Sequence, residues 1–135
     1  MIYTLGNNTL ENLESILVSG NPKSKILVNA VKAFIKYTPI DFCIIANGGY
    51  RTVDMQKDLF LCGRSKCNGT TNPSQHQKGL AVDLVPWINN RPTWNKKATF
   101  YLSGAFMLYC KEHGLEITSG AFWSFEDPCH MQIEE

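Results

Sequence analysis

The chain has 135 residues, the length of a single domain, and its 44% hydrophobic residues are enough for a core that needs no disulfides. Its 13 basic and 12 acidic side chains give a net charge of +1, which argues against a nucleic-acid-binding protein with a basic face. No apolar run reaches the ~18 residues of a membrane-spanning helix. Five cysteines, an odd number, favour free thiols in a reducing compartment. We therefore expect one domain, residues 1–135, that binds neither nucleic acid nor membrane.

The first half of the chain predicts three helices and one buried strand. A helix is expected over residues 9–18, and a second begins at Asn21-Pro22, where asparagine is the cap and proline takes the first helical position. The apolar residues of this second helix recur at helical spacing: Leu27, Ala30, Val31, Phe34 and Ile35. Residues 42–46 form an apolar run of strand length, and residues 52–61 are expected to form a helix capped by threonine.

The second half begins with a loop and ends with strands. Residues 62–75 are rich in Gly, Ser, Asn, Thr and Pro, and a loop of this length in a small domain is usually functional or mobile. Residues 80–85 predict a single strand, and residues 95–113 predict a helix. One face of that helix carries Ala98, Tyr101, Leu102, Ala105 and Tyr109. A final strand pair is expected to include residues 130–133. Helices and strands alternate without a βαβ rhythm, which indicates an α+β fold.

Two histidines and one aspartate suggest a metal site. His76 ends the polar loop, and Asp83 interrupts an apolar strand, where an unpaired charge would cost roughly several kcal/mol. His130 follows Asp127 near the C-terminus. Catalytic zinc sites use three His or carboxylate ligands and keep a fourth position for water. From spacing alone, a metal site and ordinary packed or ion-paired side chains are equally good interpretations. His113 is interpreted as a partner of a helix C-terminus and is excluded from the site.

Three segments of the chain also carry recognisable signatures in a consistent order. Residues 74–83 read Ser-Gln-His-Gln-Lys-Gly-Leu-Ala-Val-Asp and match the pattern S-x-H-x-x-G-x-A-x-D. Residues 127–130 match D-x-x-H, and residues 49–52 with Gln56 match G-Y-R-[ST]-x-x-x-Q. The chain thus resembles zinc peptidases of the D-Ala-D-Ala carboxypeptidase and VanY-like group, and in particular the phage-type L-alanyl-D-glutamate endopeptidases that act as endolysins. The resemblance implies a hedgehog/DD-peptidase-like fold, with a small antiparallel sheet and helices packed on it.

The resemblance also implies roles for individual residues. It implies that Zn²⁺ is held by three ligands: His76, Asp83 and His130. Asp127 would be the general base, and Arg51 would stabilise the oxyanion or orient a substrate carboxylate. Gln56 and Ser74 would contact the peptide, although Ser74 could equally be a local turn residue. Cys129 is expected to face away from the metal, because neighbouring residues in a strand point in opposite directions.

The implied function is hydrolysis of the peptidoglycan stem peptide, at the L-Ala–D-Glu bond. Two alternatives remain open: a D-Ala-D-Ala carboxypeptidase or dipeptidase of the same fold, and a zinc-binding module without catalysis. Asp127 and Arg51 argue against the module, because both catalytic positions are filled. Met1–Thr4 lacks the basic start and apolar core of a signal peptide. We therefore expect a protein that stays in the host cytoplasm until lysis and then reaches the periplasm and cell wall. A small single-domain hydrolase is usually a monomer, so a monomer is expected.

Overall fold

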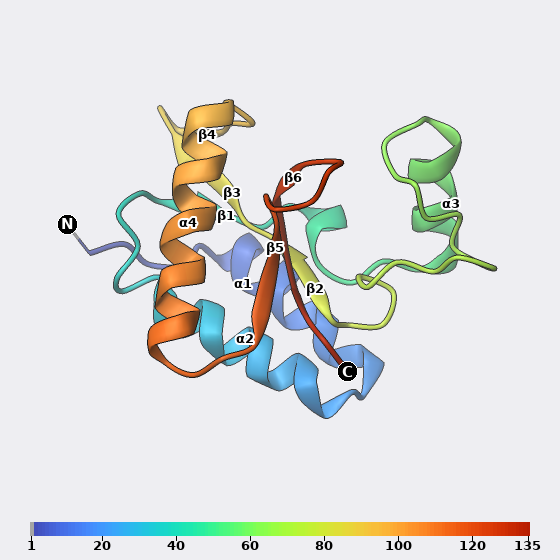
Figure 1. Ribbon diagram of the computed structural model, residues 1–135, viewed down its shortest axis with the longest axis horizontal. Coiled ribbons are helices and arrows are strands. Elements are labelled where there is room, and N and C mark those ends of the chain that lie inside the picture. The colour runs from blue at the N-terminus through green and yellow to red at the C-terminus, as the bar shows by residue number, and fades with distance from the viewer. Residues whose placement is uncertain (1) are drawn as a thin grey trace.

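The computed structural model describes residues 2–135. Met1, which belongs to the N-terminal segment without signal-peptide features, lies outside the described residues. The elements in chain order are α1 (Asn7–Glu14), η1 (Ser15–Ser19), α2 (Pro22–Phe34), β1 (Phe42–Cys43), η2 (Ala46–Gly48), α3 (Val53–Leu61), β2 (Ala81–Asp83), β3 (Val85–Ile88), β4 (Arg91–Pro92), α4 (Lys96–Glu112), β5 (Ile117–Gly120) and β6 (Asp127–Ile133). This mixture confirms the predicted α+β class (Figure 1). Within the described residues, no helix is both long and apolar enough to cross a bilayer.

The strands form two small antiparallel sheets, with the orders β1-β3-β4 and β2-β6-β5. The prediction of one strand over residues 80–85 is therefore wrong. The chain leaves one sheet and enters the other at Leu84, whose backbone N–H donates to the carbonyl of Cys129 at 2.8 Å. The predicted strand over residues 42–46 is also too long, because its last residue already belongs to the 3-10 turn η2. An apolar run in a sequence indicates that its residues are buried, but it does not indicate which strands they pair with.

The hairpin between β3 and β4 was not predicted. Its turn consists of Asn89 and Asn90, which have φ angles of 53° and 66°. Asparagine is one of the few residues that adopts this left-handed conformation readily, and two such residues in succession suit a two-residue hairpin. The Asn-Asn pair was the sequence signal for this turn.

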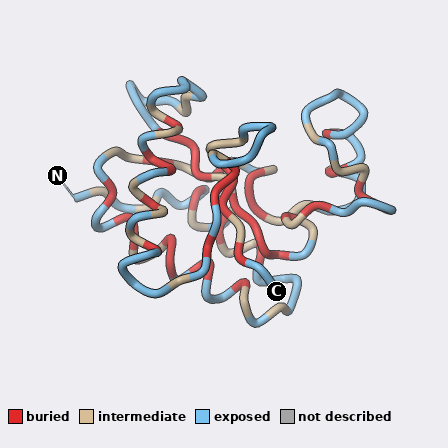
Figure 2. The backbone as a smooth tube through the Cα atoms, viewed as in Figure 1, coloured by how far each residue is buried: buried red, intermediate tan, exposed pale blue. Residues whose placement is uncertain are grey.

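The main core lies where α2 and α4 pack against each other and against β6 (Figure 2). The five apolar residues predicted at helical spacing are all buried, the first four in α2 and Ile35 at its C-terminal cap. The rings of Phe34 and Phe106 lie 5.0 Å apart between their centroids. The buried side of α4 is centred on Leu102, Phe106 and Cys110. Tyr101 was predicted on the same face as Leu102 but is exposed. The buried face of α4 runs through Leu102, Phe106 and Cys110, and Tyr101 lies outside it.

Gly79 fixes the segment between the polar loop and β2. Its φ is +70°, and a Cβ atom there would collide with the backbone oxygen of Ile16 and the hydroxyl of Ser19, both in η1. The buried hydroxyl of Ser24 donates to the carbonyl of Gly79 at 2.6 Å. The backbone that joins His76 to β2 is therefore held against η1 and α2 at a point where only glycine fits.

Replacing Gly79 by alanine should destabilise the protein by about 1–3 kcal/mol, because the new methyl group is strained by the backbone and has no space. Urea unfolding measures the change. The matched control is Gly104→Ala in α4, where a Cβ meets nothing within 4 Å; this variant should gain about 0.5–1 kcal/mol from helix propensity. A Gly79→Ala protein as stable as the wild type would contradict the assigned close approach.

Candidate metal centre

Three side chains converge where β2 pairs with β6. The register places Asp83 directly opposite His130, and His76 comes from the turn before β2. His76 Nε2 lies 3.2 Å from His130 Nδ1 and 3.3 Å from Asp83 Oδ1, and His130 Nδ1 lies 3.6 Å from Asp83 Oδ1. These three residues form a group whose ligand atoms are close enough to share one metal ion. The predicted ligand residues are thus brought together in space.

In each histidine, the ring nitrogen that points away from the centre (the outer nitrogen) makes a hydrogen bond, and this bond determines the protonation of the inner nitrogen that faces the centre. His76 Nδ1 lies 3.0 Å from the carbonyl of Gly49, and His130 Nε2 lies 2.8 Å from Gln132 Oε1. Both partners accept hydrogen bonds, so both outer nitrogens carry protons and both inner nitrogens present lone pairs. Gln132 could have been found from its spacing, since it lies on the same face of β6 as His130. A backbone carbonyl such as that of Gly49 leaves no signal in a sequence.

The residues fit a zinc ion. Asp83 Oδ1 is buried and has no hydrogen-bond partner, although such an atom is expensive to leave unsatisfied. It points toward two nitrogen lone pairs, and three lone pairs aimed at one point repel each other unless a cation lies between them. The separations of 3.2, 3.3 and 3.6 Å agree with the ~3.3 Å between ligands of a tetrahedral ion bound at about 2.0–2.1 Å.

The electrostatics of the centre favour positive charge. Burial alone would raise the pKa of Asp83, but the charge of His76 and its contacts with both histidines outweigh burial and hold that pKa far below the ordinary value. Burial alone would lower the pKa of His130, but the contact with Asp83 outweighs it and raises that pKa. A proton and a metal ion therefore compete for the same place.

Asp127 faces the same cleft but is not one of the three converging residues. Along β5 and β6, Ser119 pairs with Met131 and the next residue, Gly120, pairs with Asp127, so the residues between them in β6 form a bulge. In a regular strand Asp127 and His130 would point in opposite directions, and the bulge turns both toward one cleft. Burial and then the charge of Asp83 raise the pKa of Asp127. A carboxylate in this position can accept a proton close to a metal ion.

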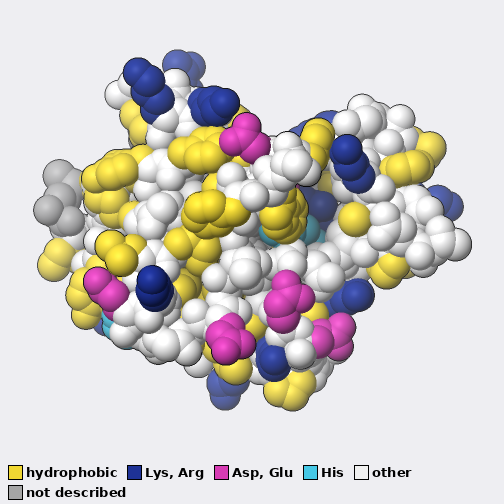
Figure 3. Space-filling model, in the orientation of Figure 1, with side chains coloured by type: hydrophobic (Ala, Val, Ile, Leu, Met, Phe, Trp, Pro, Cys, Tyr) yellow, Lys and Arg dark blue, Asp and Glu magenta, His cyan; other side chains and the backbone are white. Residues whose placement is uncertain are grey.

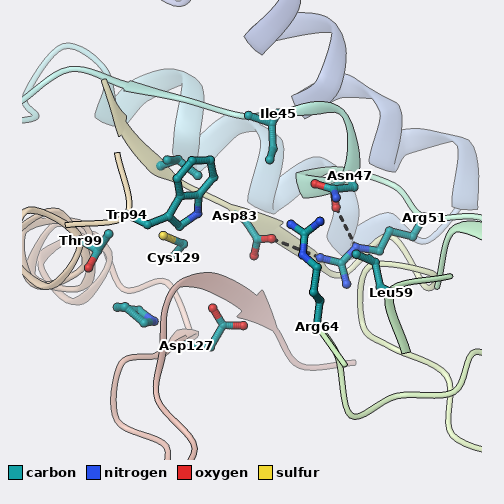
Figure 4. A pocket seen from close by; sticks show the side chains of 12 residues that line it. Ile45, Asn47, Arg51, Leu59, Arg64, Asp83, Trp94, Thr99, Asp127 and Cys129 are labelled. Carbon is teal, nitrogen blue, oxygen red and sulfur yellow. Dashed lines mark hydrogen bonds and ion pairs between the residues drawn. The ribbon is translucent and has the colours of Figure 1, made fainter. Parts of the chain in front are cut away.

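Arg51 holds the Asp83 carboxylate in place, and the side chain of Arg51 is only 12% exposed. It donates three hydrogen bonds: Nε to the carbonyl of Asn47 at 2.7 Å, Nη1 to Gln56 Oε1 at 3.0 Å and Nη2 to Asp83 Oδ2 at 3.3 Å. The remaining surface of Arg51 borders the cleft next to Asp127. Arg51 therefore orients Asp83 and adds positive charge beside the centre (Figure 4).

Gln56 is fully buried, which changes the role expected for it. Its Oε1 accepts from Arg51, and its Nε2 donates to Ser65 Oγ and to the carbonyl of Cys67, both at 2.8 Å. No surface of the side chain remains for a peptide to contact. In this structure Gln56 connects Arg51 to the long loop over residues 62–75.

The cleft over the centre is bounded by two loops, residues 62–75 and residues 121–126. The ring of Trp123 lies 4.9 Å from the ring of His130, and the Lys66 ammonium lies 4.3 Å from the ring centre of Phe125, so the loops contact each other. Ser74 lines the cleft, and its buried hydroxyl has no partner. Figure 3 shows histidine recessed between hydrophobic and basic side chains near the middle of this face. The aromatic residues of the second loop were not identified from the sequence.

Two residues near the motifs do not belong to the group of converging side chains, although Cys129 borders the hollow that Asp83 lines. His113 ends α4, where its Nδ1 lies 2.8 Å from the carbonyl of Tyr109 and its ring stacks on that of Tyr109. Cys129 is buried, and burial is the main cause that raises the pKa of its thiol to about 12. Neither residue belongs to the group of converging ligand atoms.

Known proteins share both the sequence and the fold. A family model described as phage L-alanyl-D-glutamate peptidase matches residues 1–135. The L-alanyl-D-glutamate peptidase of Escherichia phage T5 is 29% identical over 135 residues, which cover 99% of this chain and 91% of that protein. The crystal structure of the Serratia marcescens L-Ala D-Glu endopeptidase ChiX matches with a TM-score of 0.77 at 22% identity, over 98% of this chain and 91% of that chain, and this match confirms the predicted fold. As its signatures predicted, the chain belongs to the phage L-alanyl-D-glutamate peptidase family.

Proposed function

We propose that this protein is a zinc-dependent peptidoglycan hydrolase that cleaves the L-Ala–D-Glu bond of the stem peptide. The observation that carries the chemistry is the convergence of His76, Asp83 and His130, with a buried and unsatisfied carboxylate oxygen among them. Family membership and the phage T5 relative support the choice of bond. In this proposal residues 1–135 are one catalytic domain, the protein acts as a monomer, and it waits in the host cytoplasm until lysis gives it access to the cell wall.

The residues of the cleft suit amide hydrolysis. A zinc ion bound by the three ligands would polarise the scissile carbonyl and make water more acidic. Asp127 would take the proton of the attacking water and pass it to the leaving nitrogen of D-Glu, so that a C–O bond forms as the C–N bond breaks. Burial raises the pKa of Asp127, which makes its carboxylate a better acceptor for the proton of the attacking water. Arg51 would add positive charge where the oxyanion develops.

The bond is identified by the new chain ends. Digestion of purified cell walls by the zinc-loaded protein should produce peptides that begin with D-Glu and glycan-linked L-Ala with a free carboxyl group, both measured by mass spectrometry. Release of free D-alanine without these ends would contradict the proposal and select a D,D-carboxypeptidase. Intact walls after digestion would instead support the module without catalysis.

The ligand set is tested by zinc content. The His76→Ala protein should lose zinc binding, because the two remaining ligands do not close a catalytic site. The His113→Ala protein is the matched control and should keep one zinc per chain, because His113 lies outside the cluster. Zinc should also raise the unfolding temperature of the wild type and of the control, with about 2.7 kcal/mol of stabilisation at a hundredfold excess over Kd. Stoichiometric zinc in the His76→Ala protein would refute the assigned ligands.

The base is tested separately from the metal. The Asp127→Asn protein should keep its zinc and lose about 10²–10⁴-fold in kcat, because the amide accepts no proton from water. Zinc content and the rate of wall digestion are measured on the same preparation. Unchanged activity would show that another group takes the proton, and loss of zinc would show that Asp127 is itself a ligand.

A further inference from the structure

Arg64 is held at a fixed place beside the cleft by the end of α3. Gly63 adopts a φ of 80°, its N–H donates to the carbonyl of Phe60 at 3.1 Å, and the N–H of Arg64 donates to the carbonyl of Leu59 at 2.8 Å. These two hydrogen bonds form a Schellman motif, which ends a helix in a defined conformation. The side chain of Arg64 therefore starts from a rigid point of the backbone, although the loop that follows is long.

From this point the Arg64 side chain extends to the hollows beside the His76, Asp83 and His130 group. Together with Arg51 and Asp127 it lines both hollows beside the metal ligands, one extending toward Trp94 and the other toward Trp123. Figure 4 shows the Arg64 side chain pointing into the pocket toward Asp83 and Arg51. Arg64 thus faces the cleft in which the proposed function places the substrate.

Unlike Arg51, Arg64 has no partner for its charge. Arg51 forms an ion pair with Asp83, whereas in the described part of the chain no ion pair, side-chain hydrogen bond or aromatic ring engages the Arg64 guanidinium group. The charge of Arg64 is also one of the causes that lower the pKa of Arg51, after burial, which is the largest. Two guanidinium groups that feel each other's charge in one cleft favour an anion between or beside them.

We propose that Arg64 is a specificity residue that binds the free α-carboxylate of the substrate's D-glutamate. The inference rests on the proposed function. In the stem peptide D-Glu is linked onward through its γ-carboxyl group, so its α-carboxylate is free and sits on the carbon that bears the scissile nitrogen. This anion must enter a cleft that already holds the carboxylate of Asp127, which has no ion-pair partner in the described part of the chain. A cation that is not already neutralised offsets that repulsion, and the planar guanidinium fork matches a carboxylate.

The test compares two substrates that differ only in this group. N-acetylmuramoyl tetrapeptides are prepared with D-Glu or with D-isoglutamine, in which an amide replaces the α-carboxylate, and kcat/KM for cleavage after L-Ala is measured by chromatography. The zinc-loaded wild type should prefer the carboxylate roughly ten- to hundredfold, the range of one charged hydrogen-bonded contact. The Arg64→Gln protein should lose this preference, because its kcat/KM falls far more on the carboxylate substrate than on the amide. The Arg64→Lys protein should keep part of it.

The control is Arg91→Gln, which removes the same charge from an exposed arginine in β4 that lines neither hollow beside the metal ligands. It should keep the full wild-type preference. The inference is overturned if the wild type cleaves both substrates equally, or if Arg64→Gln slows both by the same factor and leaves the ratio unchanged. A wild type that cleaves neither substrate after L-Ala overturns the proposed function itself, and the two failures are thereby distinguished.

Discussion

The pairing of β2 with β6 is the constraint on which the site depends. This register sets Asp83 opposite His130, and the same short β2 strand is joined through Gly79 to the turn that carries His76. A shift of one residue would turn one of the two paired side chains to the other face of the sheet, because the side-chain period of a strand is two. The core beside this pair, built from α2 and α4, therefore stabilises the fold and the register that brings Asp83 and His130 together.

The polar and charged side chains around Asp83 and His130 differ in what they contact. His76 and His130 each fix their outer nitrogen on an oxygen, so that the inner atoms and the unsatisfied oxygen of Asp83 face one point. Arg51 neutralises the other oxygen of Asp83. Asp127 and Arg64 have no ion-pair partner within residues 2–135 and border the same cleft. The charged side chains that border the cleft without an ion-pair partner are thus one carboxylate, Asp127, and one guanidinium group, Arg64.

Much of the fold and of the candidate site could be predicted from the sequence, and the features that were missed depend on tertiary contacts. The capped helices and the buried face of α2 follow from local spacing, and the converging residues follow from motifs that place a polar ligand inside an apolar strand. The break at Leu84 and the bulge before His130 depend on which strands meet, which local patterns do not encode. Gln56 lies in a motif, yet its burial under Arg51 is a tertiary property that a motif does not reveal.

The proposed zinc site is tested by the position of zinc in a crystal, read from anomalous scattering at the zinc absorption edge. We expect one strong peak at about 2.0–2.2 Å from His76 Nε2, Asp83 Oδ1 and His130 Nδ1, with one position left open toward the cleft. A peak at the free thiols of Cys62 and Cys67, or a peak that takes Asp127 as a ligand in place of one of the three, would contradict it.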